Sequence, residues 1–595
     1  MKASNYSDLT EVLAQSVAEH QHRNAFGTKR DGVWEWTTYG ELGRRVDAFR
    51  GGLAQLGVGH GDTVAIVSAN RVEWAIAAYA TYGLGARFCP MYETQKPKEW
   101  QYIVEDSGAK VLLASTYAIY EACRDWPRDL DQLENVFCMA LPDEDVASFK
   151  SVEQRGLENP ADVAEIDSES ICGFIYTSGT TGKPKGVLLS HSNICSNING
   201  VSEFFPIDHS DISVSFLPWA HSFGQTCELH SLISRGAAIA IAESVEKLVD
   251  NFAEVRPTMM YAVPRIFNRI YDGVHKKMAA GGGLKKTLFD AAMANAEKRK
   301  QLKAEGRTSG LVEAKHKVLD KLVLSKIRAL FGGRVRYALS GGAALSPEVG
   351  QFIDNLGILV CEGYGLTETS PIATANRPGA VKIGSVGQAI PRVEIIIDTS
   401  VVDDPDSVDG EILVKGPNVM KGYHNLPEKT AEVIREDGAF RTGDLGRLDA
   451  DGFLFITGRI KEQFKLENGK YVVPGPLEES LQLSPHIAQV FIHGFNKPHL
   501  VALLIPDRVS LEGFAQENGI KGDYADVLRH PKVKRLFEEQ IGANSKNFKG
   551  YERVRNFTLV AEEFTVENGL LTPKMSVKRN QVMDRYEKEL EALYA

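Results

Sequence analysis

Cysteine is scarce and scattered in this chain of 595 residues. The cysteines form no CxxC pair and no cluster with histidine; they are Cys89, Cys123, Cys138, Cys172, Cys195, Cys227 and Cys361. Structural zinc sites and disulfide frameworks require such spacings, so we expect neither. Free thiols are typical of a reducing compartment, and we therefore expect a cytoplasmic protein.

Long apolar runs and an excess of positive charge are also missing. No run of about 18 apolar residues occurs, so we expect no membrane span, and residues 1–8 contain no apolar signal region. The formal net charge is −10. This disfavours nucleic acid as a partner, because phosphate backbones attract basic faces. Peripheral contact with the inner face of a membrane stays open.

The composition that is present, 43% hydrophobic and 25% charged, is that of an ordinary globular protein. At roughly 150 residues per domain, the length predicts three to four hydrophobic cores. Strand patterns at 64–67, 88–92 and 111–113 alternate with a helical pattern at 73–84. Strands that alternate with helices predict a parallel α/β sheet.

Residues 176–186, YTSGTTGKPKG, are the most distinctive stretch. The apolar runs 171–175 and 187–189 flank it and predict a buried strand on each side. Glycines let backbone N–H groups turn inward, and such nests bind anions. Hydroxyl groups add donors and lysines add charge. The pattern predicts a polyphosphate cradle, and a surface hairpin loop is the alternative if the stretch is taken alone.

The P-loop of nucleotidases is the nearest rival motif, and it does not fit. Thr177 stands where that motif has its first glycine, and Pro184 follows Lys183 where the motif has Ser or Thr. Pro184 also lacks an N–H group and disfavours a helix at Lys183. We therefore predict a strand–loop–strand unit. It resembles the signature loop of the adenylate-forming superfamily, which holds acyl-CoA synthetases, amino-acid adenylation domains and luciferases.

Two further glycine-containing segments follow predicted strands, namely residues 340–343 (SGGA) and 362–369 (EGYGLTET). Small residues after a parallel strand let a planar ligand approach the backbone. Tyr364 can stack on a base, Thr367 offers a hydroxyl group to phosphate, and Glu368 offers a hard oxygen that suits Mg²⁺. A lone GxG would predict only a turn. The whole second segment resembles the adenine- and Mg²⁺-binding segment of the superfamily.

His221 ends the segment LPWAH, residues 217–221. A lone histidine after a strand is usually structural. In the superfamily, a similar motif places a histidine or an aromatic residue beside the acyl carboxylate, and the resemblance implies this role for His221. Trp219 stands where relatives often have leucine. It is a wall of the acyl channel, a gate, or core packing, and the sequence leaves these open.

Asp444 lies in the segment RTGDLG, at the predicted end of a strand, where a carboxylate can accept both ribose hydroxyl groups. A plain turn is the alternative. The resemblance further implies that Arg459 is a second ribose or phosphate contact, that Lys461 lies at a hinge, and that Gly469 lines a thiol channel.

Residues 571–579, LTPKMSVKR, resemble the segment in which the superfamily has its catalytic lysine. The resemblance places that lysine at Lys578, with Lys574 as the competing candidate. A solvated lysine is the ordinary alternative for either.

Residues 281–317 have helical periodicity and a dense charge run. A solvated helical hairpin is the simplest interpretation, and a dimer contact or a membrane-surface element is the alternative. The insertion resembles one in long-chain members of the superfamily. Tyr92 and the Val577–Lys578 form also favour a long-chain acyl substrate.

The resemblance covers residues 10 to 585 and implies an α/β fold. Its expected parts are a large N-terminal domain of stacked α/β sheets plus a β subdomain (1–458), a hinge (459–462), and a small mobile C-terminal α+β domain (463–595). It implies catalytic roles for Lys578, Thr367, Glu368 and His221, and Mg²⁺ binding by Glu368 and Thr180. The residues implied to bind ATP or CoA are Thr177, Ser178, Gly179, Thr180, Thr181, Gly182, Lys183, Lys185, Gly341, Gly342, Ala343, Glu362, Gly363, Tyr364, Gly365, Thr367, Asp444, Arg459 and Gly469.

The activity implied is that of an ATP-dependent long-chain fatty acid–CoA ligase, which forms acyl-AMP and pyrophosphate and then acyl-CoA and AMP. CoA is the expected acceptor because of the long-chain-like features and because we expect no carrier-protein domain after Ala595. A fatty acyl-AMP ligase that loads a carrier protein, and a CoA ligase for a medium-chain or aryl carboxylate, are the alternatives. An inactive scaffold would have lost the loop lysines, Glu368 or Lys578. The sequence leaves acyl length, membrane attachment and a homodimer open.

Overall fold

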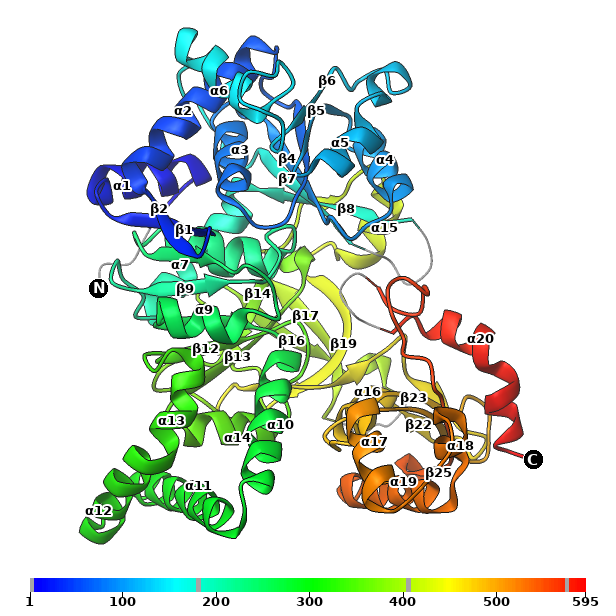
Figure 1. Cartoon of the computed structure of the whole chain (residues 1–595). Helices are drawn as coiled ribbons and strands as arrows, with labels where there is room; N and C mark the ends of the chain where they lie inside the picture. Colours follow the sequence, from blue (N-terminus) through cyan, green and yellow to red (C-terminus); the bar gives the residue numbers. More distant parts are fainter. Residues whose placement is uncertain (1–4, 178–182, 403–407, 573–576) are drawn as a thin grey trace. The chain divides into compact units, whose positions relative to one another are not determined.

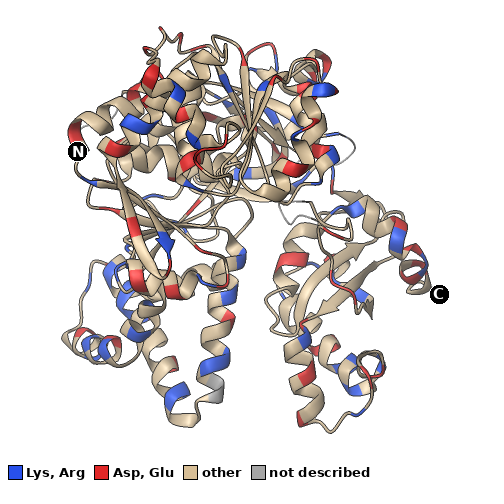
Figure 2. Ribbon diagram, turned by 45° about the horizontal axis from the view of Figure 1, so that its top comes forward, with Lys and Arg blue, Asp and Glu red and all other residues tan. Residues whose placement is uncertain are grey.

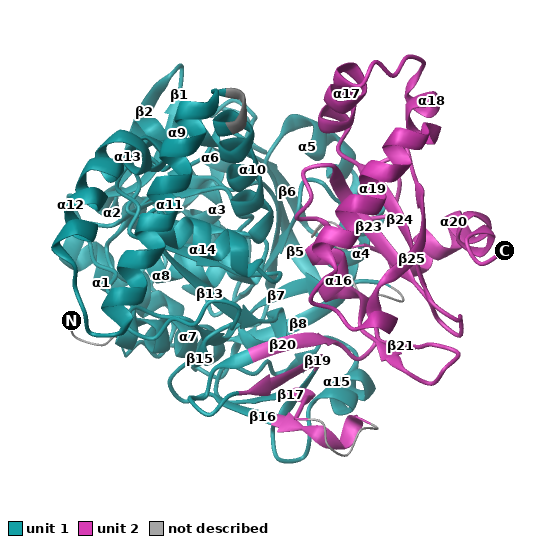
Figure 3. Ribbon diagram, turned by 90° about the horizontal axis from the view of Figure 1, so that it is seen from below, with its two compact units in different colours: residues 1–396, 413–442, 449–454 teal, residues 397–412, 443–448, 455–595 magenta. Residues whose placement is uncertain are grey.

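The computed structural model describes residues 5–177, 183–402, 408–572 and 577–595 (Figure 1). The chain divides into two compact units, which Figure 3 colours separately. Unit 1 comprises Met1–Ile396, Leu413–Thr442 and Asp449–Leu454, and unit 2 comprises Ile397–Ile412, Gly443–Leu448 and Phe455–Ala595. The described residues include no helix that is both long and apolar enough to cross a bilayer.

The first sheet of unit 1 has seven strands in the order β18-β8-β7-β4-β3-β5-β6. Its parallel part confirms the alternating pattern predicted from the sequence, because β3, β4 and β5 pair in parallel and α3 and α4 lie between them in the chain. The strands are β3 (Thr63–Val67), β4 (Arg87–Met91), β5 (Ala109–Ala114), β6 (Asn135–Cys138), β7 (Ile171–Thr177), β8 (Lys185–Ser190) and β18 (Gly422–Tyr423). The accompanying helices are α1 (Leu9–His20), α2 (Tyr39–Gln55), α3 (Val72–Tyr82), α4 (Pro97–Asp106), α5 (Tyr117–Cys123), α6 (Phe149–Glu158) and α15 (Pro427–Val433).

Two more sheets of unit 1 have the orders β2-β1-β10-β9 and β11-β12-β13-β14-β15. Thr258 N, just before β11, donates a hydrogen bond to Ile212 O in β9 at 2.9 Å. The strands are β1 (Asn24–Arg30), β2 (Val33–Thr38), β9 (Ile212–Ser215), β10 (Ala238–Ile241), β11 (Met259–Ala262), β12 (Tyr337–Ser340), β13 (Leu359–Gly365), β14 (Ile372–Ala375) and β15 (Gln388–Ala389). Their helices are α7 (His191–Phe204), the π-helix η2 (Phe223–His230), α8 (Ser231–Ile233), α9 (Leu248–Val255) and α14 (Pro347–Asn355).

Parallel pairing decides where the loops of these sheets lie. β11, β12 and β13 run in parallel, as do β9 and β10. The carboxyl ends of parallel strands meet at one edge of a sheet. The loops that follow β12 and β13 therefore start from the same edge.

A group of helices, α10 (Pro264–Ala280), α11 (Gly283–Ala304), α12 (Gly310–Leu319), the π-helix η3 (Asp320–Leu324) and α13 (Ser325–Arg328), interrupts the chain between β11 and β12. Figure 1 shows these helices extending away from the sheets of unit 1. They confirm the helical pattern predicted for residues 281–317.

Unit 2 contains a three-stranded sheet in the order β23-β24-β25. β23 and β24 are antiparallel, and β24 and β25 are parallel. The elements are β21 (Phe464–Lys465), β22 (Tyr471–Val472), α16 (Pro474–Leu481), β23 (Ile487–His493), β24 (Leu500–Pro506), α17 (Arg508–Glu517), α18 (Tyr524–Arg529), α19 (Pro531–Asn544), β25 (Val554–Leu559) and α20 (Arg579–Ala592). A further sheet orders β16 (Glu394–Asp398), β17 (Gly410–Lys415), β19 (Phe440–Leu448) and β20 (Leu454–Arg459). Mixed helices and strands in a large N-terminal and a small C-terminal part match the predicted fold class.

Helices α2 and α6 approach each other so closely that only glycine fits between them. A Cβ atom on Gly156 would lie 1.7 Å from the carbonyl oxygen of Ala48, and one on Gly52 would lie 2.0 Å from the carbonyl oxygen of Val152. Backbone atoms cannot move aside as a flexible side chain can. The contact therefore requires glycine on both helices.

We predict that Gly156→Ala lowers the free energy of unfolding by at least about 3 kcal/mol, because the added methyl group must push the two helices apart. Gly273→Ala is the control: Gly273 lies inside α10 with no atom within 4 Å of the added carbon, and alanine there should stabilise the helix by about 0.5–1 kcal/mol. Urea denaturation followed by tryptophan fluorescence measures both. Equal midpoints for the two variants would contradict the close helix contact.

Candidate active site

The ends of the predicted phosphate loop lie on two paired strands. β7 ends at Thr177, and its register partner Lys185 begins the antiparallel strand β8. This confirms the predicted strand–loop–strand unit. The Lys183 ammonium lies 4.8 Å from the ring centroid of Tyr102. The central loop residues lie outside the described part of the chain; they are Ser178, Gly179, Thr180, Thr181 and Gly182.

Tyr423 connects this loop to Glu368. The Lys185 ammonium lies 4.0 Å from the centroid of the Tyr423 ring, and the Tyr423 hydroxyl donates to Glu368 Oε1 at 2.8 Å. Burial and the nearby Glu368 carboxylate both raise the pKa of Tyr423. The hydroxyl group therefore keeps its proton and remains a donor to Glu368. No role for Tyr423 was predicted, since nothing near it in the sequence marks it.

Glu368 has the chemistry that a Mg²⁺ site needs. One oxygen is taken by Tyr423, and Oε2 accepts no hydrogen bond from the described residues. Mg²⁺ usually takes one or two carboxylate oxygens and fills its octahedron with water and substrate phosphates. A single half-exposed carboxylate that Tyr423 links to Lys185, at the end of the predicted phosphate loop, fits that ion. Thr180, the second predicted ligand, lies outside the described residues.

The His221 segment adjoins both glycine-containing segments. Thr367 Oγ1 lies 3.4 Å from Ser222 Oγ, and the Phe223 ring lies 3.3 Å from where a Cβ atom on Gly341 would stand. His221 Nδ1 accepts the backbone N–H of Phe223 at 3.2 Å. A neutral imidazole that accepts at Nδ1 carries its proton on Nε2. That nitrogen can donate to a carboxylate.

Gly341, Gly342 and Ala343 follow β12 at its carboxyl end. Gly342 has a φ of +84°, a backbone conformation that favours glycine. Gly342 and Ala343 are exposed. The small side chains leave the loop backbone open to a flat ligand, as the sequence suggested.

Glu362 holds the far end of that loop. Its carboxylate accepts the backbone N–H of Leu345 at 2.9 Å. Burial raises the pKa of Glu362 to about 7, although this hydrogen bond lowers it. The structure thus gives the carboxyl group a contact to the loop backbone.

The segment Gly363, Tyr364 and Gly365 was expected after a strand, but the structure includes it in the end of β13. There the strand pairs in antiparallel fashion with β14, with a register shift between Tyr364 and Gly365. A Cβ atom on Gly365 would lie 1.7 Å from the carbonyl oxygen of Pro371. Glycine therefore permits close pairing here, where the sequence suggested a break.

Asp444 and Arg459, the predicted ribose contacts, belong to unit 2 and lie side by side. Arg459 Nε is 2.7 Å from Asp444 Oδ1, and Asp444 is buried. The sequence placed Asp444 at a strand end, but the structure places it inside β19. It follows Gly443, which has a φ of +72°. β19 continues through Gly443, where the sequence had left a turn as the alternative.

Lys461 is exposed in a turn after β20, where the N–H groups of Glu462 and Gln463 donate to the carbonyl oxygen of Arg459 at 3.2 and 3.0 Å. Gly469 lies in the turn between β21 and β22 with a φ of +85°. The hinge role of Lys461 and the channel role of Gly469 stay predictions.

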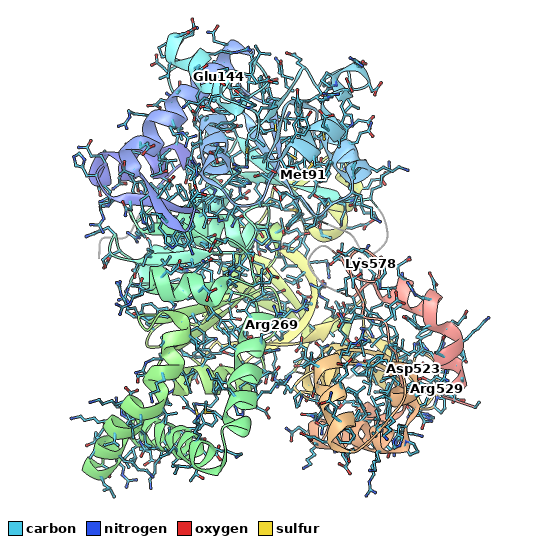
Figure 4. The ribbon with its side chains drawn as sticks, in the orientation of Figure 1. Met91, Glu144, Arg269, Asp523, Arg529 and Lys578 are labelled. Atoms are coloured by element: carbon cyan, nitrogen blue, oxygen red, sulfur yellow. The ribbon has the colours of Figure 1, made fainter. Side chains whose placement is uncertain are left out.

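Lys578 immediately precedes α20, and Figure 4 labels it at the start of that helix. Its backbone N–H donates to Leu570 O at 2.8 Å. The next residue, Arg579, donates to Glu478 Oε2 at 3.0 Å and to Ile492 O at 2.7 Å. This ion pair fixes the chain beside Lys578, and the sequence missed it. Lys574 lies outside the described residues.

Two family models match nearly the whole chain. The model described as AMP-binding enzyme matches residues 13–424, and the model of its C-terminal domain matches residues 461–595. The chain belongs to the AMP-binding enzyme family. This confirms the predicted adenylate-forming superfamily.

Relatives of this AMP-binding enzyme match along most of its length. The long-chain-fatty-acid–CoA ligase FadD15 of Mycobacterium tuberculosis is 33% identical over 572 residues, which cover 95% of this chain and 93% of the relative. Long-chain-fatty-acid–CoA ligase 1 of Cavia porcellus is 31% identical over 625 residues, covering 99% and 86%.

Solved structures share the fold of this AMP-binding enzyme. The adenylation domain of a carboxylate reductase from Mycobacterium chelonae has a TM-score of 0.78 at 24% identity, covering 99% of this chain and 91% of that domain. ATP-bound MatB from Rhodopseudomonas palustris has a TM-score of 0.73 at 22% identity, covering 98% and 100%.

A buried carboxyl group that the sequence missed lies behind the His221 segment of the enzyme. Glu228, in the π-helix η2, accepts hydrogen bonds from Ser213 Oγ at 2.5 Å and Ser215 Oγ at 2.6 Å. Ser215 Oγ itself accepts Trp219 Nε1–H at 3.0 Å. Burial raises the pKa of Glu228 to about 7, although the serine hydroxyl groups lower it.

Asn70 extends this network to the backbone of the segment. Its side chain donates to Leu217 O at 2.7 Å and to Ser215 Oγ at 3.0 Å, and accepts Trp219 N–H at 2.8 Å. Trp219 is fully buried and packs against the rings of Phe26 and Trp74. Trp219 therefore packs in the core, and its roles as a channel wall or gate stay predictions.

We predict that Glu228→Gln becomes more stable relative to the wild type as pH rises. Between the ordinary glutamate pKa of 4.5 and the folded value of about 7, the folded protein holds a proton that the unfolded chain releases. The free energy of unfolding therefore falls by roughly 3 kcal/mol as pH rises through this window. Glutamine removes this loss and still accepts from Ser215.

Urea denaturation of both proteins at several pH values measures the difference. Glu228→Leu, the control, leaves two serine hydroxyl groups without an acceptor and should be less stable than Glu228→Gln by about 2 kcal/mol or more at every pH. If the difference in the free energy of unfolding between Glu228→Gln and wild type does not change with pH, Glu228 does not titrate in this window.

Proposed function

We propose that this chain is an ATP-dependent long-chain fatty acid–CoA ligase. The observation that carries the proposal is a run of contacts in unit 1 from Lys185 through Tyr423 to Glu368, and from Thr367 to Ser222, whose neighbour Phe223 adjoins Gly341. Phosphate-binding, metal-binding and acyl-side residues therefore adjoin, as an acyl-adenylating site requires. Relatives with this name, about a third identical, support the acyl and CoA substrates.

A free carboxylate resists attack by a thiol because it is anionic and has no good leaving group. Joining it to AMP gives a mixed anhydride, with attack at the α-phosphorus and departure of pyrophosphate. Charge develops on phosphate oxygens, so positioning and electrostatics should dominate catalysis. His221 would hold the acyl carboxylate, and Lys578 would neutralise charge on the α-phosphate.

The nucleotide would be held by the other predicted residues. Thr177, Lys183 and Lys185 would hold the β- and γ-phosphates with the rest of the loop, and Asp444 and Arg459 would hold the ribose. Mg²⁺, when bound at Glu368 with Thr180, would neutralise charge on the phosphate oxygens. The adenine ring would lie against the 341–343 backbone and Tyr364.

The second half-reaction needs a thiol where Lys578 stood. We propose that residues 463–595 rotate about the hinge 459–462 near Lys461 and bring the Gly469 turn to the acyl group. The same proposal includes domain boundaries at 458 and 463. It also includes a cytoplasmic location, peripheral membrane contact and a homodimer.

The products formed from ATP and palmitate, with and without CoA, test the activity. We expect AMP and pyrophosphate, with palmitoyl-CoA when CoA is present. Acyl-AMP that accumulates without a thioester would instead identify a carrier-protein ligase. ADP as the product, or no turnover with any fatty acid, would overturn the proposal.

We predict that Lys578→Ala slows acyl-AMP formation by roughly 10²–10³-fold, the loss typical of one electrostatic contact to a developing charge. Transfer to CoA from supplied acyl-AMP should change only a few-fold, because the lysine acts in the first half-reaction. Rapid-quench assays of each half-reaction measure the two rates.

The matched control is Lys588→Ala, which removes an exposed lysine from the same helix, α20, and should leave both rates unchanged. A Lys578→Ala variant that slows both half-reactions equally, or neither, would exclude the assigned role.

A further inference from the structure

Charge is distributed very unevenly along this chain. Helices α10 to α13, between Pro264 and Arg328, contain sixteen Lys and Arg residues and six Asp and Glu residues, a formal charge of +10. The whole chain has a formal charge of −10. The helical projection therefore has the opposite sign to the rest of the molecule, and Figure 2 shows Lys and Arg along these helices.

The few acidic residues of the projection do not offset this charge at its surface. Four of them form ion pairs with basic residues of the same helices: Asp290 with Lys286, Glu305 with Arg307, Glu313 with Arg299, and Asp320 with Arg328. Exposed lysines remain that form no ion pair within the described part of the chain; they include Lys298, Lys303, Lys315, Lys317 and Lys321.

Some of these lysines flank apolar side chains that face solvent. Leu311, Val318 and Leu322 are 81%, 57% and 48% exposed. Spacings of seven and four place them on one face of the continuous helix formed by α12 and η3. Lys315 and Lys321 fall on the same side. We call these five residues the leucine–lysine stripe.

An adjoining face of the same helix is buried. Val312, Leu319 and Leu324 point into the projection and are at most 8% exposed. The helix thus has two apolar faces, and only one is covered by the chain itself. A third exposed leucine, Leu284, is 76% exposed and precedes Lys285 and Lys286 at the start of α11.

We propose that the leucine–lysine stripe is a docking surface for a bilayer that contains anionic lipids. Lysines attract the negative headgroups, and the leucines and valine insert at the boundary between headgroups and acyl chains. The combination matters, because either feature alone is common on soluble proteins. The stripe would also let the enzyme take up a fatty acid dissolved in the membrane, and this part of the proposal rests on the proposed function. The binding of lipid itself does not depend on that function.

Two other occupants fit the stripe less well. A nucleic acid would pair with the lysines but would leave the exposed leucines in water. A second copy of this chain, joined by a two-fold axis, would bring the same +10 projection against itself, and like charges in contact oppose association. Anionic lipid satisfies both the charge and the apolar side chains.

Vesicle flotation of the full chain tests the proposal. The vesicles are phosphatidylcholine alone or with about 30% phosphatidylglycerol, at about 50 mM and about 500 mM NaCl. We expect at least about tenfold tighter binding to the anionic vesicles at low salt, and loss of this preference at high salt. Binding that ignores lipid charge and salt, or no binding, would overturn the proposal.

Variants locate the surface. Lys315→Glu with Lys321→Glu should weaken binding by roughly twentyfold or more, since each lysine near an anionic surface contributes about fivefold. Leu311→Ser with Leu322→Ser should weaken binding several-fold. The matched control reverses two exposed lysines of unit 2, Lys534→Glu with Lys588→Glu, and gives the same net charge. An equal loss of vesicle binding in the control would mean that overall charge causes the effect, and it would contradict the assignment of the surface to the stripe.

Two further measurements distinguish a failure of the lipid assignment from a failure of the proposed function. Sedimentation velocity of the stripe variants detects a second copy as the occupant: dissociation of a dimer on Lys315→Glu with Lys321→Glu would overturn the lipid assignment. AMP formation from a short, water-soluble fatty acid without vesicles should be unchanged in the stripe variants. Vesicle binding without any ligase activity would leave the surface standing and reject the proposed function instead.

Discussion

The hydrogen bond from Tyr423 to Glu368 joins parts of unit 1 that are far apart in the sequence. Tyr423 belongs to β18, which pairs with β8 at the edge of the seven-stranded sheet. Glu368 follows β13 in a different sheet. Lys185, at the start of β8, lies against the same tyrosine ring. The pairing of β18 with β8 and the Met420 N–H group, which donates to Glu368 O at 2.9 Å, hold the same segments together, and the tyrosine hydroxyl adds the contact to the carboxylate itself.

Parallel strand pairing provides the second condition for the site. β12 and β13 deliver Gly341 and Glu362 to one edge of their sheet, and contacts from Ser222 and Phe223 bring the His221 segment to the same place. Glu362 then fixes the loop after β12 by accepting the Leu345 N–H group. Each loop is anchored by a neighbour from another strand, so the site is a property of the sheet edge and not of any single motif.

The sequence predicted the local elements well, because their signals are local. Apolar runs of strand length identified β3, β5, β7 and β8, and the proline after Lys183 excluded a helix. The prediction was wrong where a glycine is required by a contact between distant segments. Gly365 reads as a strand break, yet it lies in β13 because the Pro371 carbonyl leaves no room for a side chain.

Contacts between distant segments could not be predicted from one sequence. Nothing adjacent in the chain marks Tyr423 as the partner of Glu368, 55 residues away. Glu228 looks like any helical glutamate until the fold buries it against Ser213 and Ser215. Arg579 reads as part of a solvated basic tail, and only the position of β23 and α16 reveals Glu478 and Ile492 as its partners.

The way in which the chain passes between its two units limits what a hinge can move. The backbone crosses from one unit to the other at residues 396–397, 412–413, 442–443, 448–449 and 454–455. One flexible peptide after all these crossings cannot turn unit 2 as a whole, because the earlier segments are tethered on both sides. A rotation near Lys461 would therefore carry only the residues that follow it. Asp444 and Arg459 precede that point and would stay behind, so AMP would keep the proposed ribose contacts while Lys578, the proposed catalytic lysine, departs.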